Sequence, residues 1–348
     1  MPNHFTSLIA MSASLMAAPT YAANVVTDIA PVHGLVSMVM EGAGQPTLLV
    51  TQTASPHHFS LKPSQARDLE RADVVFYVGE ALSPWIEAPL SALAGNAAKV
   101  SLMEAKGVTT HSFRDTALLK NDNDDHDGHE DHDKHDDHDG HDKHDDHDTH
   151  GEDKHHDDHH DEDAHMDHHD HDHHGQVDPH LWLDPMNAIL WLDTIADTLS
   201  KADPEHADLY HANAKKAVGS LTQQTTELSA SLGALSNMGY VVQHDAYQYF
   251  EARFGLHPIG SISLSDATKP SAKRLSTLKA KLKSANISCA FKEPQMSHKL
   301  LNVVLPKDTR IVDLDPIGAA IPLGVQFYPQ FLDSLNTAFV TCASDAVK

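Results

Sequence analysis

The stretch NVVTDIAPVHGLVSMVMEGAGQPTLLV, residues 24–50, places a helical pattern between two runs rich in β-branched and aliphatic residues. We expect one strand over 25–29 and another over 47–50. Between them, apolar residues at helical spacing predict a helix over 30–41. A strand, a helix and a strand in this order indicate a βα unit, and repeated βα units build parallel sheets.

The same alternation continues through the first half of the chain and restarts in the second half. A helix over 63–72 precedes a third strand over 74–78. After residue 239, strands are expected over 240–243, 259–262, 287–291 and 310–312, with helices over 250–254 and 269–285. Two separate sets of βα units predict an α/β fold with two lobes, each built on a parallel sheet.

Two helical segments separate these halves. Residues 185–202 carry apolar side chains at amphipathic spacing, which predicts one helix. Asp203 and Pro204 then give a helix cap followed by proline at the first helical position. The next pattern runs without proline to about Leu235, so a helix of about 30 residues and about 45 Å is expected. Such a helix predicts a rigid strut that joins the two lobes.

The length of 348 residues suggests about two domains. We expect a signal peptide over 1–23, an N-terminal lobe over 24–185, connecting helices over 186–236 and a C-terminal lobe over 237–348. Residues 121–174, inside the first lobe, hold 24 acidic residues, three lysines and 19 of the 30 histidines of the chain. Because this segment has almost no apolar side chains to bury, we expect a disordered His/Asp-rich loop.

The acidic balance of the chain excludes some classes of function. The formal net charge is −25, and residues 121–174 carry −21 of it. A chain this acidic is not expected to bind nucleic acid, because phosphates repel carboxylates. No run approaches the roughly 18 consecutive apolar residues of a transmembrane helix, so membrane insertion is not expected either.

The N-terminus indicates export. Residues 8–18 form a modest apolar run, and Thr20-Tyr21-Ala22 or Tyr21-Ala22-Ala23 offers a small-residue cleavage signal. The segment before the run has no Lys or Arg. The alternative is an N-terminal helix that stays on the protein. In an exported chain the only two cysteines, Cys289 and Cys342, most simply form one disulfide, worth about 4 kcal/mol in the chain-entropy model. Two buried thiols are the alternative.

Three histidines outside the His/Asp-rich loop stand in similar contexts. His57 follows a predicted strand, His180 precedes a predicted helix and His244 ends a predicted strand. Two-lobed α/β proteins bind ligands in the cleft at the carboxyl ends of their strands. Three imidazoles there could hold Zn²⁺ with a fourth position for water or a carboxylate. Each histidine taken alone is better explained as a loop or helix-capping residue, since spacing of 123 and 64 residues does not indicate proximity.

Three motifs in order resemble those of the metal-specific substrate-binding proteins of ABC transporters. They are Pro-His-His-Phe with Pro-Ser over 56–64, His-Leu-Trp-Leu-Asp-Pro over 180–185, and HDAYQYF over 244–250 followed by Phe-Gly-Leu over 254–256. CAFKEPQ over 289–295 and LDPIG over 314–318 extend the likeness across nearly the whole mature chain. A His-rich loop between the first two motifs is typical of the zinc-uptake members of that family.

The resemblance implies a metal site and a set of ligands. It assigns His57, His180 and His244 as ligands of a transported Zn²⁺, with Asp315 as a fourth ligand, a supporting acceptor or a loop cap. It also implies a periplasmic monomer without enzymatic activity that delivers zinc to an inner-membrane ABC permease. A histidine at position 244 favours Zn²⁺ over Mn²⁺, since Mn²⁺ prefers oxygen ligands. Asp184 and Asp245 are expected to be a helix cap and an orienter of a ligating imidazole.

The His/Asp-rich loop itself has metal-binding capacity. Imidazoles and carboxylates at this density suit Zn²⁺, Cu²⁺, Ni²⁺ and Co²⁺ with little discrimination, which predicts a weak collector or sensor of zinc. The alternative is a solvated charge run. The low-affinity ligands expected are His126, His129, His132, His135, His138, His141, His144, His147 and His150.

Other functions remain open at this point. The same three histidines could bind manganese or another divalent metal, or the loop alone could serve as a metal buffer. An exported hydrolase with three histidines and a water on zinc is a further possibility. The sequence has no HExxH and no GxSxG motif to support it.

Overall fold

The computed structural model describes residues 22–114, 177–264 and 269–344. These residues belong to one of the two units into which the chain divides, that of residues 1–119 and 174–348. The His/Asp-rich segment and the expected signal peptide therefore lie outside the described residues, apart from Ala22 and Ala23. All that follows concerns that unit.

The first lobe is a parallel sheet of four strands in the order β2-β1-β3-β4. The strands are β1 (Val25–Thr27), β2 (Thr47–Leu48), β3 (Val74–Tyr77) and β4 (Ala98–Ser101). The helices beside them are α1 (Ala30–Val39), α2 (Pro63–Glu70) and α3 (Glu87–Ala92), with a short 3-10 turn η1 (Leu102–Glu104). The three strands expected in this half are confirmed, each ending one or two residues earlier than expected.

Alternation along the strands decides which helices cover which face. Val74 and Phe76 point into the main core with α1, whereas Val75 and Tyr77 belong to a second core beneath α2 and α3. Successive side chains of a strand point to opposite faces of the sheet, so a strand buried on both faces is apolar throughout. This is why β3 reads Val-Val-Phe-Tyr without a polar residue.

The second lobe repeats the arrangement. Its four parallel strands have the order β6-β5-β7-β8, with bounds β5 (Tyr240–His244), β6 (Gly260–Ser263), β7 (Cys289–Lys292) and β8 (Ile311–Asp313). Its helices are α6 (Gln248–Phe254), α7 (Ala272–Leu282), α8 (Lys299–Val304) and α9 (Phe327–Ala343). Leucines of α7 and α8 pack on one face of this sheet, and α9 packs on the other.

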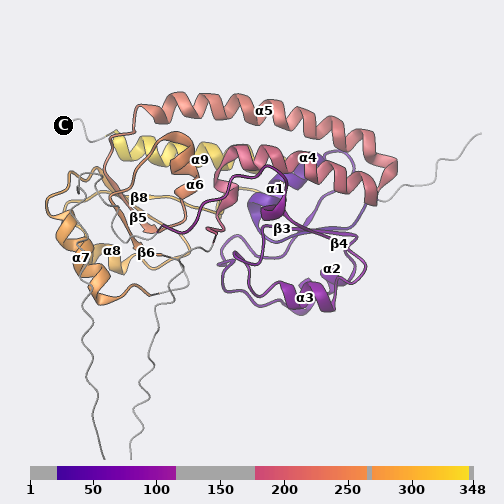
Figure 1. Cartoon of the computed structure of the whole chain (residues 1–348), viewed down its shortest axis with the longest axis horizontal. Helices are drawn as coiled ribbons and strands as arrows, with labels where there is room; N and C mark the ends of the chain where they lie inside the picture. The colour runs from indigo at the N-terminus through magenta and orange to yellow at the C-terminus, as the bar shows by residue number, and fades with distance from the viewer. Residues whose placement is uncertain (1–21, 115–176, 265–268, 345–348) are drawn as a thin grey trace, which may run out of the picture. The chain divides into compact units, whose positions relative to one another are not determined.

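Two long helices join the lobes (Figure 1). After η2 (Leu181–Leu183), α4 (Pro185–Ala202) has the predicted bounds, and η3 (Pro204–His206) leads into α5 (Ala207–Gly233). The 27 residues of α5 span about 40 Å. It packs against α4, against α1 of the first lobe and against α9 of the second lobe. The expected strut is confirmed, whereas the domain boundaries at 185 and 236 stay a prediction.

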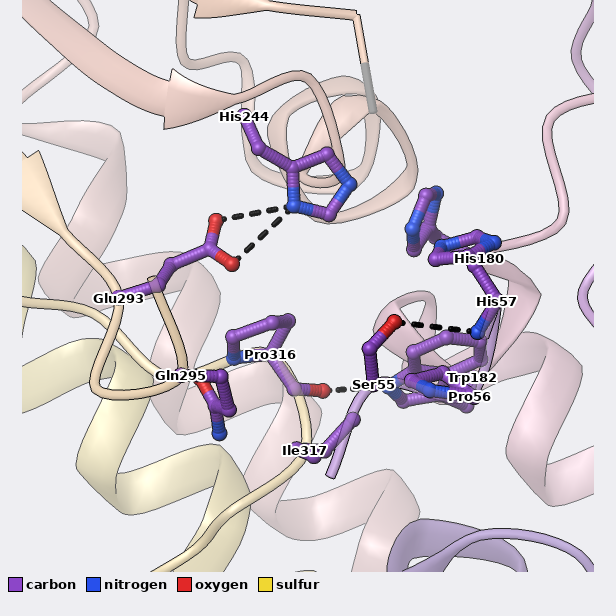
Figure 2. Close-up of a pocket in the computed structure, with 10 residues that line it drawn as sticks. All are labelled: Ser55, Pro56, His57, His180, Trp182, His244, Glu293, Gln295, Pro316 and Ile317. Atoms are coloured by element: carbon purple, nitrogen blue, oxygen red, sulfur yellow. Dashed lines mark hydrogen bonds and ion pairs between the residues drawn. The ribbon is translucent and has the colours of Figure 1, made fainter. Parts of the chain in front are cut away.

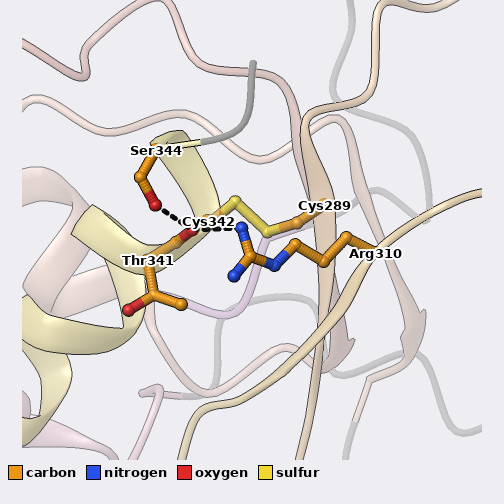
Figure 3. The surroundings of a disulfide bond; sticks show 5 residues. All are labelled: Cys289, Arg310, Thr341, Cys342 and Ser344. Carbon is orange, nitrogen blue, oxygen red and sulfur yellow. Dashed lines mark hydrogen bonds between the residues drawn. A yellow bond between two sulfur atoms is a disulfide. The ribbon is translucent and has the colours of Figure 1, made fainter. Parts of the chain in front are cut away.

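The disulfide expected between the two cysteines is present (Figure 3). Cys289 in β7 and Cys342 in α9 are bonded, with their Cα atoms 5.5 Å apart. Beside it, Arg310 donates a hydrogen bond of 2.8 Å from Nη1 to the carbonyl of Thr341. The disulfide fastens α9 to β7, one of the two inner strands of the second sheet. Among the described residues, no helix is both long and apolar enough to cross a membrane.

Candidate metal centre

The three histidines singled out from the sequence lie together. His57 is in the loop between β2 and α2, His180 stands directly before η2, and His244 is the last residue of β5. One ring nitrogen of each lies within 4.8 Å of the others. The ring centroids are 5.0 Å apart for His180 and His244, and 5.4 and 6.1 Å from His57 to those two rings. Segments 123 and 64 residues apart in sequence therefore converge on one point.

This spacing is close to what a tetrahedral zinc ion requires. Zn–N bonds of about 2.0–2.1 Å place ligand nitrogens about 3.4 Å apart. Movements of about an ångström would bring the three imidazoles to that distance. The donor set is chemically suitable, because neutral imidazole is a preferred ligand of Zn²⁺.

His180 is oriented by a buried carboxylate. Its Nδ1 lies 2.7 Å from Oδ1 of Asp178, and the same oxygen accepts a hydrogen bond of 3.1 Å from the backbone N–H of His180. Both side chains are buried. A carboxylate at Nδ1 draws the proton of the neutral ring to that nitrogen, so the lone pair is carried by Nε2.

His244 has a corresponding support from the second lobe (Figure 2). Its Nδ1 lies 3.1 Å from each carboxylate oxygen of Glu293, which follows directly after β7. Glu293 is itself held, since its backbone N–H donates to Gln243 over 3.0 Å and the hydroxyl of Tyr247 donates to its Oε1 over 3.3 Å. The neighbouring strands β5 and β7 thus supply the imidazole and its carboxylate.

His57 is held through its backbone. Its N–H donates to Oγ of Ser55 over 3.2 Å, and the preceding carbonyl, that of Pro56, accepts from Nε1 of Trp85 over 2.7 Å. Ser83 also donates to this carbonyl, over 3.4 Å. The ring is half-buried, in contrast with the buried rings of His180 and His244.

A small cavity adjoins the three rings. It offers about 20 Å³ to the centre of a water-sized sphere, enough for about one water molecule. Pockets that hold organic ligands usually measure at least about 300 Å³. The cavity fits an ion and a water rather than an organic substrate. Its lining consists of Ser55, Pro56, His57, His180, Trp182, His244, Glu293, Gln295, Pro316 and Ile317.

Burial raises the pKa of Asp178 to about 7, although the backbone N–H of His180 and the charges of Arg114 and His244 oppose this shift. An ionised carboxylate in such a place is stabilised by positive charge nearby. A cation bound by His180 would therefore favour the ionised form of Asp178.

Ion pairs tie the two lobes together beside the site. Arg114, in the segment after β4, donates to the carboxylate of Asp245, next to His244, and lies 2.7 Å from Oε2 of Glu251 in α6. Burial raises the pKa of Glu251 to about 7, with Arg114 opposing it. Arg253 of α6 pairs with Asp184, the N-cap of α4, over 2.7 Å. Removing one partner of such a buried pair leaves an uncompensated charge.

The structure corrects one expectation about the carboxylates and confirms another. Asp184 caps α4, as expected, by accepting from the N–H of Met186. Asp245 was expected to orient an imidazole, but its carboxylate accepts both hydrogen bonds from Arg114. The orienting acids are Asp178 and Glu293. The available signals were a carboxylate two residues before His180 and another shortly after the strand expected over 287–291.

Asp315 is not a member of the three-histidine cluster. Its oxygens accept from the amide of Gln295 over 2.9 Å and from the backbone N–H groups of Ile317 and Ala319. These bonds favour the loop-capping role among those expected, and ligation by Asp315 stays an untested prediction. The nine histidines expected as low-affinity ligands, from His126 to His150, lie outside the described residues.

Comparison with known proteins decides the family. The sequence profile of the family described as zinc-uptake complex component A, periplasmic (ZnuA), matches residues 25–342. The chain belongs to this family. It is 39% identical over 321 residues to the high-affinity zinc uptake system protein ZnuA of Brucella suis biovar 1, covering 92% of this chain and 91% of that protein. It is 37% identical over 343 residues to the protein of the same name from Paracoccus denitrificans, covering 98% of each.

A solved structure shows the same fold. The crystal structure of a ZnuA protein superposes with a TM-score of 0.66 at 21% identity, covering 92% of this chain and 98% of that one. The expected fold, two parallel-sheet lobes with a joining helix, is therefore confirmed. Membership of the ZnuA family makes the chain a periplasmic, substrate-binding component of a transport system and not an enzyme.

Proposed function

We propose that His57, His180 and His244 bind one Zn²⁺ through imidazole nitrogens in the cleft between the lobes, and that this ion is the cargo of an ABC importer. The observation that carries the proposal is the convergence of these three rings to within 4.8 Å, with two of them backed by buried carboxylates. Capture and delivery, without chemical change of the ion, make up the function. The fourth position suits a water molecule in the adjoining cavity.

The donor set favours zinc over manganese. Three neutral imidazoles suit a borderline cation, whereas Mn²⁺ prefers carboxylate and carbonyl oxygen. Asp178 and Glu293 approach the histidines at Nδ1, so they support the ligands. With Asp315 engaged by Gln295, Ile317 and Ala319, the cluster remains a nitrogen site.

The alternative of an exported zinc hydrolase has little support. A hydrolase needs space for its substrate beside the metal-bound water. The cavity at the three histidines, of about 20 Å³, does not provide it.

Several features of the transport cycle are part of the same proposal. The chain is exported with cleavage of residues 1–23, acts as a monomer, and passes zinc to the inner-membrane permease of the importer. Residues 121–174 collect or sense zinc with low affinity. Support for these statements comes from the apolar N-terminal run, from the membership of the ZnuA family and from the density of imidazoles.

A competitive zinc titration tests the ligand set. Single variants His57→Ala, His180→Ala and His244→Ala are made in a chain without residues 121–174, so that weak sites do not obscure the tight one. Each is expected to lose the tight 1:1 site while keeping the circular dichroism of the parent. His33→Ala is the matched control, because His33 is a buried histidine that bonds Pro46 and Ser37 outside the cluster. Tight binding in any of the three ligand variants would contradict the proposal.

A further inference from the structure

The outer helices of the two lobes differ in charge. Residues 269–310, which include α7 and α8, contain ten lysines and arginines against two acids, Glu293 and Asp308. The corresponding part of the first lobe, residues 62–99 with α2 and α3, contains four basic residues against five acids. The net charges are therefore +8 and −1.

Most lysines of this part of the second lobe are exposed, whereas Lys281 and Lys292 are half-buried. Leu278, Leu282, Leu301 and Val304 turn inward onto the sheet, which leaves the polar sides of α7 and α8 outside. We call the exposed lysines on and beside these two helices the basic face. Lys273 and Lys279 lie in α7 and Lys299 in α8, and Lys269, Lys283 and Lys307 lie in the segments next to them. This face lies on the side of the sheet away from α5 and α9 (Figure 1).

The basic face carries little internal compensation. Within the part of the chain that the structure describes, Lys273, Lys283, Lys299 and Lys307 form no ion pair, whereas nearby Lys292 pairs with Asp313 over 2.8 Å. Asp308 is the only exposed acid between residues 269 and 310. A surface that carries an excess of one sign of charge attracts surfaces of the opposite sign.

We propose that the basic face is the surface through which this protein docks onto an acidic periplasmic surface of its permease. The proposal rests on the proposed function, because a capture protein must meet its permease to release zinc. Residues 121–174 carry −21 and the chain outside them and outside residues 269–310 carries −12, so the +8 of residues 269–310 makes this the part of the chain that attracts an acidic partner. Complementary charge of this kind accelerates encounter and fixes the orientation of the partners, while leaving binding reversible.

The test reverses the charge of the face without touching the zinc site. The variant carries Lys273→Glu, Lys283→Glu, Lys299→Glu and Lys307→Glu in the full chain. Its matched control carries Lys62→Glu, Arg67→Glu, Arg71→Glu and Lys99→Glu on exposed positions of the first lobe, with the same change of net charge. Zinc affinity and circular dichroism of both purified variants are measured first. Uptake of radiolabelled zinc is then measured in zinc-starved cells that contain equal periplasmic amounts of each protein.

The expected result separates docking from binding. Both variants keep the zinc affinity of the parent within about twofold, as surface substitutions usually do. The basic-face variant lowers the rate of zinc uptake by at least about tenfold, the lower end of electrostatic effects on association, and the control does not. Equal uptake by the two variants would overturn the proposal. Loss of zinc affinity in the basic-face variant would overturn it too, since the face would then act on the site.

Two further arms exclude other acidic partners of the face. Sedimentation with vesicles of phosphatidylethanolamine and phosphatidylglycerol is expected to be equally weak for parent and variant, and lysine-dependent binding there would assign the face to lipid headgroups instead. Both variants are also made without residues 121–174, and the uptake defect is expected to persist. A defect that disappears with that deletion would contradict docking onto the permease. Failure of the parent protein to restore zinc uptake would refute the proposed function itself, independently of the lysines.

Discussion

His180 and His244 are held differently from His57. Each of the first two is buried and has its Nδ1 against a buried carboxylate, Asp178 or Glu293. His57 is half-buried on a loop that is anchored by the carbonyl of Pro56. The comparison indicates two buried ligands that carboxylates hold in place and a third, less buried ligand that its loop positions. Preorganised groups lose less conformational entropy on binding, so the pair should contribute most of the affinity.

The largest expected effect compares the ligands with one another. His180→Ala and His244→Ala each break the preorganised pair, whereas His57→Ala leaves it intact. We expect the zinc affinity that remains in His57→Ala to exceed that of the other two by at least about tenfold, because preorganisation favours the pair. Titration against a chelator series measures the three values. Equal losses of zinc affinity in all three variants would show that His57 contributes as much as His180 and His244.

The next effect concerns the carboxylates behind the pair. Asp178→Asn and Glu293→Gln keep the size of the side chain but remove the charge that holds the Nδ1 proton. Each is expected to weaken zinc binding by about 10–100-fold, the usual range for residues that orient metal-ligating histidines. Asp313→Asn, at an exposed aspartate that pairs with Lys292, is the control and should leave the affinity unchanged. Unchanged affinity in both test variants would show that the carboxylates only fill space.

The stability of the protein is expected to depend on pH through Glu251, which lies in α6 close to His244. The pKa of Glu251 is raised to about 7 by burial, from an ordinary value of 4.5. Glu251 contributes its full stabilisation below pH 4.5, and this stabilisation is lost as the pH rises towards 7. In that range the folded protein keeps the Glu251 proton, whereas the unfolded chain releases it. Over that range the free energy of unfolding falls by about 1.4 kcal/mol per pH unit from this group alone.

Urea unfolding of zinc-free protein at pH 5, 6 and 7 measures this contribution. Glu251→Gln cannot release a proton, so the stability of the wild type relative to this variant should decrease as the pH rises. A difference that stays constant, or grows, would mean that Glu251 is already ionised at pH 5 in the folded protein.

The smallest expected effect is on zinc affinity, from a change behind the loop of His57. Trp85→Phe keeps the aromatic contact with Phe59, whose ring centroid lies 5.2 Å away, but removes the hydrogen bond to the carbonyl of Pro56. Loss of one such bond costs about 1 kcal/mol, or about fivefold in zinc affinity if the loop is ordered mainly in the bound state. Isothermal titration of zinc checks it. A loss of zinc affinity as large as that of Asp178→Asn would show that the loop of His57 matters as much as the carboxylate behind His180.

Much of the architecture follows from local sequence. The amphipathic pattern over 185–202 gives α4 with the predicted bounds, and Asp203-Pro204 marks the start of the next helical segment. Strands buried on both faces are rich in aliphatic and aromatic residues, which made β3 and the Tyr-Val-Val start of β5 predictable. The helix α9 was not predicted; Pro329 stands in its first turn, where proline is tolerated but resembles a break.

The site was only partly predictable. The motifs around His57, His180 and His244 singled out the histidines, but their convergence depends on the packing of two lobes. The partners of Asp245 and His244 illustrate the limit. Arg114 reaches Asp245 across 131 residues, and Glu293 reaches His244 across 49, and no local pattern encodes such contacts.

The central claim is that one zinc ion is held by three imidazoles from distant parts of the chain. Anomalous diffraction at the zinc absorption edge, from crystals of the zinc-loaded protein, tests it most directly. The account predicts a single strong peak between the lobes, about 2.0–2.1 Å from one nitrogen each of His57, His180 and His244. A peak bound by carboxylates elsewhere, or one that any of these three rings does not reach, would contradict it.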